Sequence, residues 1–158
     1  MYYHVMTPPR PPSQDAPALT PTLDFLRLLW RIEHGLQQTS KRMEATLGIT
    51  GPQRLVLKVV RHFPGLTAGE LAHIVQLHPS TITGVLQRLE RKGLLRRDRD
   101  ALDQRRVHLT VRPEARRLAD RRKGTVEAAV ENVLGRISGE HVAHAREVLT
   151  AIADALDA

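Results

Sequence analysis

The stretch Thr67–Arg112, TAGELAHIVQLHPSTITGVLQRLERKGLLRRDRDALDQRRVHLTVR, holds the most specific local signals in the chain. Thr67 and Glu70 have the spacing of a capping box, so a short helix is expected to begin there. A second helix is expected over residues 79–92, because it would start with a proline in its first turn and a glycine follows directly after its end. Two short helices joined by a tight turn predict a helix-turn-helix.

The second of these helices would have an inward apolar face and an outward face of small, hydrogen-bonding groups. The outward residues are Ser80, Thr81, Thr83, Gly84 and Gln87. Such groups can read base edges in a major groove. An ordinary amphipathic helix with a solvated polar face would show the same pattern, and the helix alone does not separate these two interpretations.

The segment after this helix favours DNA binding. Residues 94–100 and 105–111 predict two strands, and apolar side chains alternate at period two in the second. A hairpin that follows a recognition helix is a wing, here residues 94–111, and its arginines can reach a minor groove or the phosphate backbone. The residues expected at the backbone and wing contacts are Arg88, Arg91, Arg97, Arg99, Asp103, Arg105 and Arg106.

The same residues resemble the MarR-type winged-helix transcriptional regulators. The likeness rests on Arg88-Leu-Glu-Arg-Lys-Gly-Leu94, Arg96-Arg97 and Asp103-x-Arg105-x-Val107-x-Leu109-x-Val111 running into Pro113, and it extends over about residues 20–158. The resemblance implies that Asp103 orients the hairpin and that Arg105 contacts DNA. The chain departs from the family at Arg112 and Ala115, where threonine and glycine are common, and a weaker cap is expected for the helix that follows.

Composition narrows the classes of function. The chain has 158 residues, enough for one domain, and only 3% aromatic residues, which disfavours stacking of single-stranded bases. It has no cysteine, which excludes disulfides, thiolate zinc sites and thiol-based peroxide sensing. We identify no phosphate-binding loop, nucleophile elbow or suggestive carboxylate pair, so no enzymatic activity and no cofactor are expected.

Charge is concentrated around the expected recognition helix and wing. The net charge is +7, and residues 88–123 hold 14 Lys and Arg against 6 Asp and Glu, whereas residues 124–158 hold 2 against 6. This distribution is typical of polyphosphate binding. A solvated basic face and an anionic membrane surface are the alternatives. The membrane is disfavoured because arginine and apolar residues alternate at strand period and no long basic amphipathic helix precedes them.

The rest of the chain predicts a Pro-rich arm and a helical base. Residues 1–21 hold six of the ten prolines and no apolar signal-peptide core, so a disordered arm on a soluble, cytoplasmic protein is expected. Helices are expected over residues 22–47, 53–63, 113–137 and 140–156. Residues 22–48 and 113–158 would form the dimerisation region and residues 49–112 the DNA-binding lobe. The fold class is therefore mainly α with a β-hairpin wing.

Two further groups of residues are candidate ligand sites. Trp30, Arg31 and His34 could bind a small phenolic or aromatic-acid effector of the kind the resemblance implies, although we prefer a packing role for the tryptophan. His141 and His144 have a spacing that could share a metal, but no third ligand accompanies them, and no metal site is expected.

Together these patterns predict a sequence-specific regulator that binds double-stranded DNA. The family resemblance further implies a homodimer on an inverted repeat, a repressor that is released by a small aromatic ligand. A nucleoid-like architectural protein and a winged-helix module that binds protein remain the alternatives.

Overall fold

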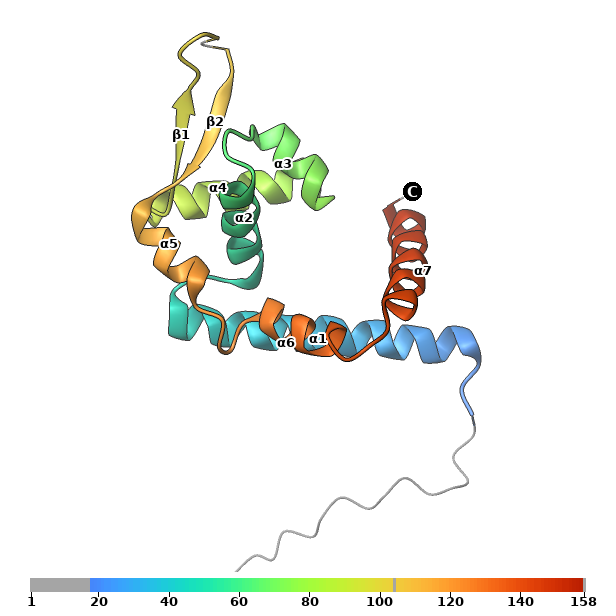
Figure 1. Cartoon of the computed structure of the whole chain (residues 1–158). Coiled ribbons are helices and arrows are strands. Elements are labelled where there is room, and N and C mark those ends of the chain that lie inside the picture. Colours follow the sequence, from blue (N-terminus) through green and yellow to red (C-terminus); the bar gives the residue numbers. More distant parts are fainter. Residues whose placement is uncertain (1–17, 104, 158) are drawn as a thin grey trace, which may run out of the picture. The chain divides into compact units, whose positions relative to one another are not determined.

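The computed structural model describes residues 18–103 and 105–157, so most of the predicted Pro-rich arm lies outside the described residues. The order of elements in this part is α1 (Pro21–Leu47), α2 (Gly51–His62), α3 (Ala68–Val75), α4 (Pro79–Arg91), β1 (Leu95–Arg99), β2 (Val107–Val111), α5 (Pro113–Asp120), α6 (Val126–Leu134) and α7 (Gly139–Asp157) (Figure 1). The predicted fold class, mainly α with a β-hairpin wing, is confirmed.

Contacts divide the chain into two units, residues 1–34 and residues 35–158. The first unit contributes the beginning of α1 to the described residues. The second contains the helix-turn-helix α3–α4, the hairpin β1–β2 and the helices around them. The following description of packing concerns this second unit.

The predicted capping box at the start of α3 is present, and α2 begins with a second one. At α3 the Thr67 hydroxyl accepts the Glu70 N–H at 3.3 Å, and the Glu70 carboxylate accepts the Thr67 N–H at 2.7 Å. At α2 Thr50 and Gln53 make the same reciprocal pair. These contacts satisfy backbone donors that a helix start leaves unpaired, and they set where α2 and α3 begin.

The hairpin is antiparallel and is attached to the helical lobe by a backbone hydrogen bond. Leu95 lies opposite Val111 and Arg99 opposite Val107. The Leu109 N–H donates to the Leu66 carbonyl at 2.8 Å, which joins β2 to the loop before α3. The wing is therefore anchored at its base, while its tip extends beyond the helices (Figure 1).

The core lies inside this lobe. α2 contacts α3, α4, α5 and β2, and the buried cluster is formed by Ile49, Val56, Leu57, Val60, Leu71, Ala72, Ile82, Val85, Leu86, Leu89, Leu94, Leu95, Leu109, Val111 and Ala115. Each fully buried leucine or isoleucine side chain stabilises the fold by about 1.5–3 kcal/mol. The recognition helix and the wing thus rest on one apolar cluster.

The inward face of α2 differs from the pattern that its leucines and valines suggest. An inward set of Leu55, Val56, Val59 and Val60 is expected from helical spacing, but Leu55 is 48% exposed and Arg54 is only 1% exposed. The face is rotated because the Arg54 guanidinium points inward to backbone carbonyls near the end of α5. Arg54 therefore lies on the buried side of α2, where helical spacing predicts Leu55.

The single helix predicted over residues 113–137 is wrong, because the structure has two helices there. α5 ends at Asp120 and α6 begins at Val126, with Gly124 in the left-handed region at φ 76°. Arg54 donates to the carbonyls of Leu118, Ala119 and Arg121 and to the Glu127 carboxylate. These contacts satisfy the carbonyls that the end of α5 leaves unpaired. As expected, the start of α5 at Arg112 has no side-chain cap.

The helices outside the lobe leave their apolar side chains exposed. α6 and α7 bury no residue, and α1 buries only Met43. The large exposed apolar side chains of these helices include Leu23, Phe25, Leu26, Trp30, Ile32, Leu36, Val130, Val133, Leu134, Val148, Leu149 and Leu156. None of the helices in the described part of the chain is both long enough and apolar enough to cross a membrane.

Candidate nucleic-acid interface

The recognition helix α4 is held by its inner face and presents the predicted outer face to solvent. Ile82, Val85, Leu86 and Leu89 are buried in the lobe core. Ser80, Thr81, Thr83 and Gln87 are exposed, and Gly84 is partly exposed. The five residues predicted to read bases therefore share an accessible surface of one rigid helix.

The five residues differ in whether their side chains already make hydrogen bonds within α4 or to its N-cap residue His78. The Thr83 hydroxyl donates to the Pro79 carbonyl at 2.9 Å, and the Ser80 hydroxyl pairs with His78 Nδ1 at 2.7 Å. Within the described part of the chain the Gln87 amide has no hydrogen-bond partner, so its donor and acceptor are both available. Gln87 is thus the residue of the set best suited to make two hydrogen bonds to one base.

Close beside Gln87, the Arg88 side chain lies over Gly84. The Arg88 Nε donates to the Gly84 carbonyl at 3.0 Å, and a Cβ added at Gly84 would come within 3.3 Å of the guanidinium. The absence of a side chain at Gly84 leaves room for this arginine on the outer face of α4.

Four predicted wing residues come together at a cleft between the wing and the start of α3. The cleft has a volume of about 470 Å³, and Arg97, Asp103, Arg105 and Arg106 line it together with Thr67, Ala68 and Gly69. Arg97 pairs with Glu90 at 2.8 Å and Arg106 pairs with Glu70 at 2.9 Å. In the described residues Arg99 and Arg105 have no ion pair, so these two cations are available to phosphate.

Two aspartates organise the tip of the wing. Asp100 Oδ1 accepts the N–H groups of Leu102 at 2.7 Å and Asp103 at 3.1 Å. Asp103 Oδ1 in turn accepts the Arg105 N–H at 3.0 Å. The Asp103 carboxylate therefore fixes the backbone of Arg105, whose guanidinium has no ion pair among the described residues.

A histidine that the sequence analysis did not single out connects this tip to the lobe. His108 Nε2 lies 2.6 Å from Asp100 Oδ2, and its Nδ1 lies 2.5 Å from the Gly65 carbonyl. The hydrogen bond to Asp100 raises the pKa of His108. The same hydrogen bond, together with the Leu102 and Asp103 N–H groups, lowers the pKa of Asp100 to about 2. The pairing of β1 with β2 does not reveal the contact between His108 and Gly65, because these two residues are distant in sequence.

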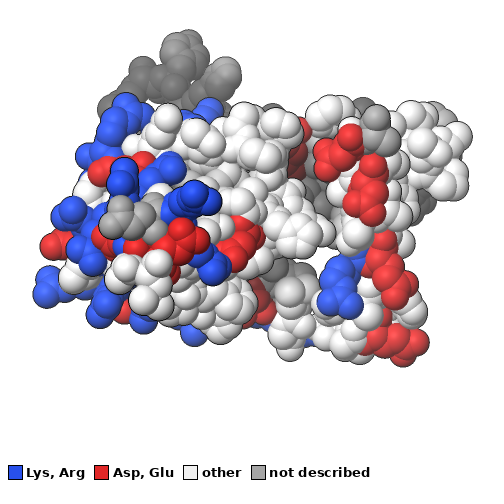
Figure 2. Space-filling view, turned by 90° about the horizontal axis from the view of Figure 1, so that it is seen from above, with Lys and Arg blue, Asp and Glu red and all other residues white. Residues whose placement is uncertain are grey.

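Positive and negative side chains gather on different parts of the surface. In the view onto the wing, Lys and Arg gather over the lobe, whereas Asp and Glu predominate over α7 (Figure 2). A positive field over the recognition helix and wing attracts a polyphosphate and raises the rate of association.

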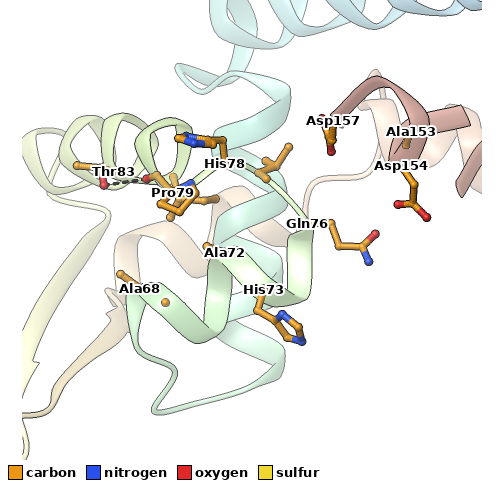
Figure 3. Close-up of a pocket in the computed structure, with 13 residues that line it drawn as sticks. Ala68, Ala72, His73, Gln76, His78, Pro79, Thr83, Ala153, Asp154 and Asp157 are labelled. Carbon is orange, nitrogen blue, oxygen red and sulfur yellow. Dashed lines mark hydrogen bonds between the residues drawn. The ribbon is translucent and has the colours of Figure 1, made fainter. Parts of the chain in front are cut away.

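The predicted effector residues belong to the other unit of the chain. Trp30, Arg31 and His34 are on α1 in the unit of residues 1–34, and Trp30 is 66% exposed. A different cleft, of about 840 Å³, has His73, Gln76 and His78 on its helix-turn-helix side and Asp154 and Asp157 on its α7 side (Figure 3). Across the described residues there is no group of three or more His, Asp or Glu side chains that could hold a metal.

Comparison with known proteins places these features in a family. The family model "MarR family" matches residues 49–107. The chain is 31% identical over 111 residues to the HTH-type transcriptional repressor Rv2887 of Mycobacterium tuberculosis. The match covers 70% of this chain and 80% of that protein. It is 28% identical over 104 residues to the transcriptional regulator HosA of Escherichia coli O157:H7, covering 66% of this chain and 77% of that protein.

Solved structures show the same likeness. The transcriptional regulator PcaV from Streptomyces coelicolor, in complex with its natural ligand, is 27% identical with a TM-score of 0.68, covering 89% of this chain and 99% of that chain. MepR from S. aureus in a DNA complex has a TM-score of 0.68 at 24% identity, covering 84% and 97% of the two chains. At this identity the likeness to MepR shows a common fold and no more.

Proposed function

This chain belongs to the MarR family of transcriptional regulators, and on that premise we propose that it is a homodimeric repressor that binds an inverted repeat in double-stranded DNA. In this proposal the α4 helix of each protomer enters a major groove and reads bases. The arginines of each wing contact the adjacent backbone or minor groove. Binding would occlude a promoter.

The observation that carries this proposal is the combination of a neutral reading face and a cationic wing on one lobe. Gln87 lies exposed on α4 with both halves of its amide unpaired among the described residues, and Arg105 is positioned by the Asp103 carboxylate at the wing tip. Neutral amides distinguish base pairs, whereas cations at phosphate add affinity without regard to sequence. A surface that served only for charge attraction would not need the neutral face.

The homodimer is supported by the apolar side chains that α1, α6 and α7 leave exposed. A second copy would cover many of these side chains and remove a large apolar area from water. A two-fold dimer would present two α4 helices, so the half-sites of its operator would have centres about 10 bp apart, one turn of the duplex.

For release from DNA we propose a small phenolic or aromatic carboxylate effector near Trp30, Arg31 and His34 of α1. The exposed Trp30 ring offers an apolar face, and the neighbouring arginine offers a partner for a carboxylate. The effector would act by changing the spacing of the two recognition helices, which requires that it bind the two arrangements of the dimer with different affinity.

Selection from a library of random duplexes tests the operator. Recovered sequences should contain an inverted repeat with the half-site spacing given above. Recovery of single, asymmetric half-sites would contradict the symmetric dimer, and the absence of any enriched sequence would favour an architectural protein with little sequence preference.

A further inference from the structure

Both ring nitrogens of His108 face hydrogen-bond acceptors. Nδ1 lies 2.5 Å from the carbonyl oxygen of Gly65, and Nε2 lies 2.6 Å from Asp100 Oδ2. A carbonyl oxygen can only accept. The Gly65 side of this contact therefore requires an N–H on Nδ1.

The Asp100 side also requires a donor. Asp100 Oδ1 accepts two backbone N–H groups, from Leu102 and Asp103, and these contacts together with His108 keep the pKa of this carboxyl at about 2. Asp100 is thus ionised at neutral pH and can only accept. A neutral imidazole has a single N–H, so one of the two contacts would set an acceptor against an acceptor. The imidazolium, with two N–H groups, satisfies both.

Among the described residues, Asp100 and Arg106 are the charged groups that act on the pKa of His108, and several charged residues on the neighbouring elements are engaged in other ion pairs. On β1, Asp98 lies opposite His108 in the ladder and pairs with Arg96 at 2.9 Å. On β2, Arg106 lowers the pKa of His108 but pairs with Glu70 of α3. The loop 63–66 has no titratable side chain, and at the end of α2 Arg61 pairs with Asp120. Asp100 is the carboxylate that contacts the ring.

The contacts of His108 join three parts of the DNA-binding surface. Gly65 belongs to the loop between α2 and α3, Asp100 organises the backbone of the wing tip, and that tip positions Arg105 through Asp103. Loss of the ring proton would break one of the two contacts. The carboxylate attracts the remaining N–H more strongly than a neutral carbonyl does, so the contact to Gly65 would be lost first.

We propose that His108, as an imidazolium, is a positioning residue that holds the wing against the α2–α3 loop and makes DNA binding weaken as the pH rises. The inference rests on the proposed function, because it assumes that the wing contacts DNA. The sign follows from the direction of the shift. The hydrogen bond to Asp100 raises the pKa of His108 above its usual value near 6.5, so the wing contact is complete below that value and is lost as the pH rises through the raised pKa.

The test is the affinity of the full-length protein for its selected operator and for a shuffled duplex, measured from pH 6 to pH 9 at constant ionic strength. The wild type should lose affinity as the pH rises through the raised pKa, by up to about tenfold per pH unit for each of the two wings of the proposed dimer, the limit for one linked proton per wing. His108→Gln should bind more weakly at pH 6 and lose this share of the pH dependence. The control His144→Gln, which changes an exposed histidine of α7, should retain the wild-type profile.

Titration of the ring signals by NMR supplies a measurement that does not depend on DNA. His108 should titrate above its usual value near 6.5, and Asp100→Asn should bring its pKa down toward that value. A His108 pKa at or below 6.5, or an unchanged pH profile in His108→Gln, would overturn the inference. If the wild type binds no duplex at any pH, the proposed function fails, and the positioning role fails with it.

Discussion

The guanidinium of Arg54 connects α2 to three carbonyls and one carboxylate that lie more than 60 residues further along the chain. It is 1% exposed. A buried charge is tolerated only when it is paired and its donors are satisfied, and both conditions hold here. The Arg54 side chain therefore joins the DNA-binding lobe to the start of α6, the first helix after the break.

Replacing this arginine should destabilise the fold. Arg54→Met replaces the arginine by an apolar side chain of similar length and leaves the carbonyls and Glu127 without their donor. We therefore expect the free energy of unfolding to fall by about 3 kcal/mol. Denaturant unfolding measures this loss. The control Lys58→Met removes an exposed cation that also contacts Glu127, at 3.4 Å, and should change the stability by less than about 1 kcal/mol. Equal effects of the two substitutions would contradict the role of Arg54.

A second prediction at the residue scale concerns Asp103. Removing its negative charge from a basic wing should tighten DNA binding if charge alone mattered. Because its carboxylate holds the Arg105 N–H, we expect Asp103→Ala to weaken operator binding instead. Titration of labelled duplex gives the sign, and circular dichroism checks that the variant is folded. Tighter binding by a folded variant would show that Asp103 does not position Arg105.

Among the elements, the break between α5 and α6 is the feature that apolar spacing does not predict. Local signals identified α3, α4 and the wing, because capping boxes, an N-terminal proline and period-two alternation act within a few residues. The Arg54 and His108 contacts depend on residues that the fold brings together from distant parts of the chain. Gly124 followed by Thr125 was the available signal for the break, since Thr125 caps α6.

The left-handed conformation at this break can be tested directly. Gly124 has φ 76° and open space around its Cα, so Gly124→Ala should cost about 1–2 kcal/mol of stability from backbone conformation alone. The control Gly69→Ala also enters open space, but within helix α3, and should be neutral or stabilising by up to about 1 kcal/mol. Thermal unfolding compares the two. A neutral Gly124→Ala would contradict the left-handed turn.

For the whole molecule, the exposed apolar faces of α1, α6 and α7 are the main argument that the protein acts as a pair of chains. A charge on such a face would be buried without a partner in the dimer. Leu149→Glu should therefore shift the protein from dimer to monomer at micromolar concentration in sedimentation experiments. Ala151→Glu adds the same charge at another exposed position of α7 and should leave the dimer intact. Dimers in both variants would place the interface elsewhere.

The central claim is that the lobe reads the sequence of duplex DNA and is not merely attracted to its charge. The most direct test is the affinity of the wild type and of Gln87→Ala for the selected operator and a shuffled duplex at two salt concentrations. We predict that the wild type prefers the operator at both salts. Gln87→Ala should lose roughly 1–3 kcal/mol of this preference while keeping the same dependence on salt. Equal affinity of the wild type for the two duplexes, with the same fall as salt increases, would contradict the account.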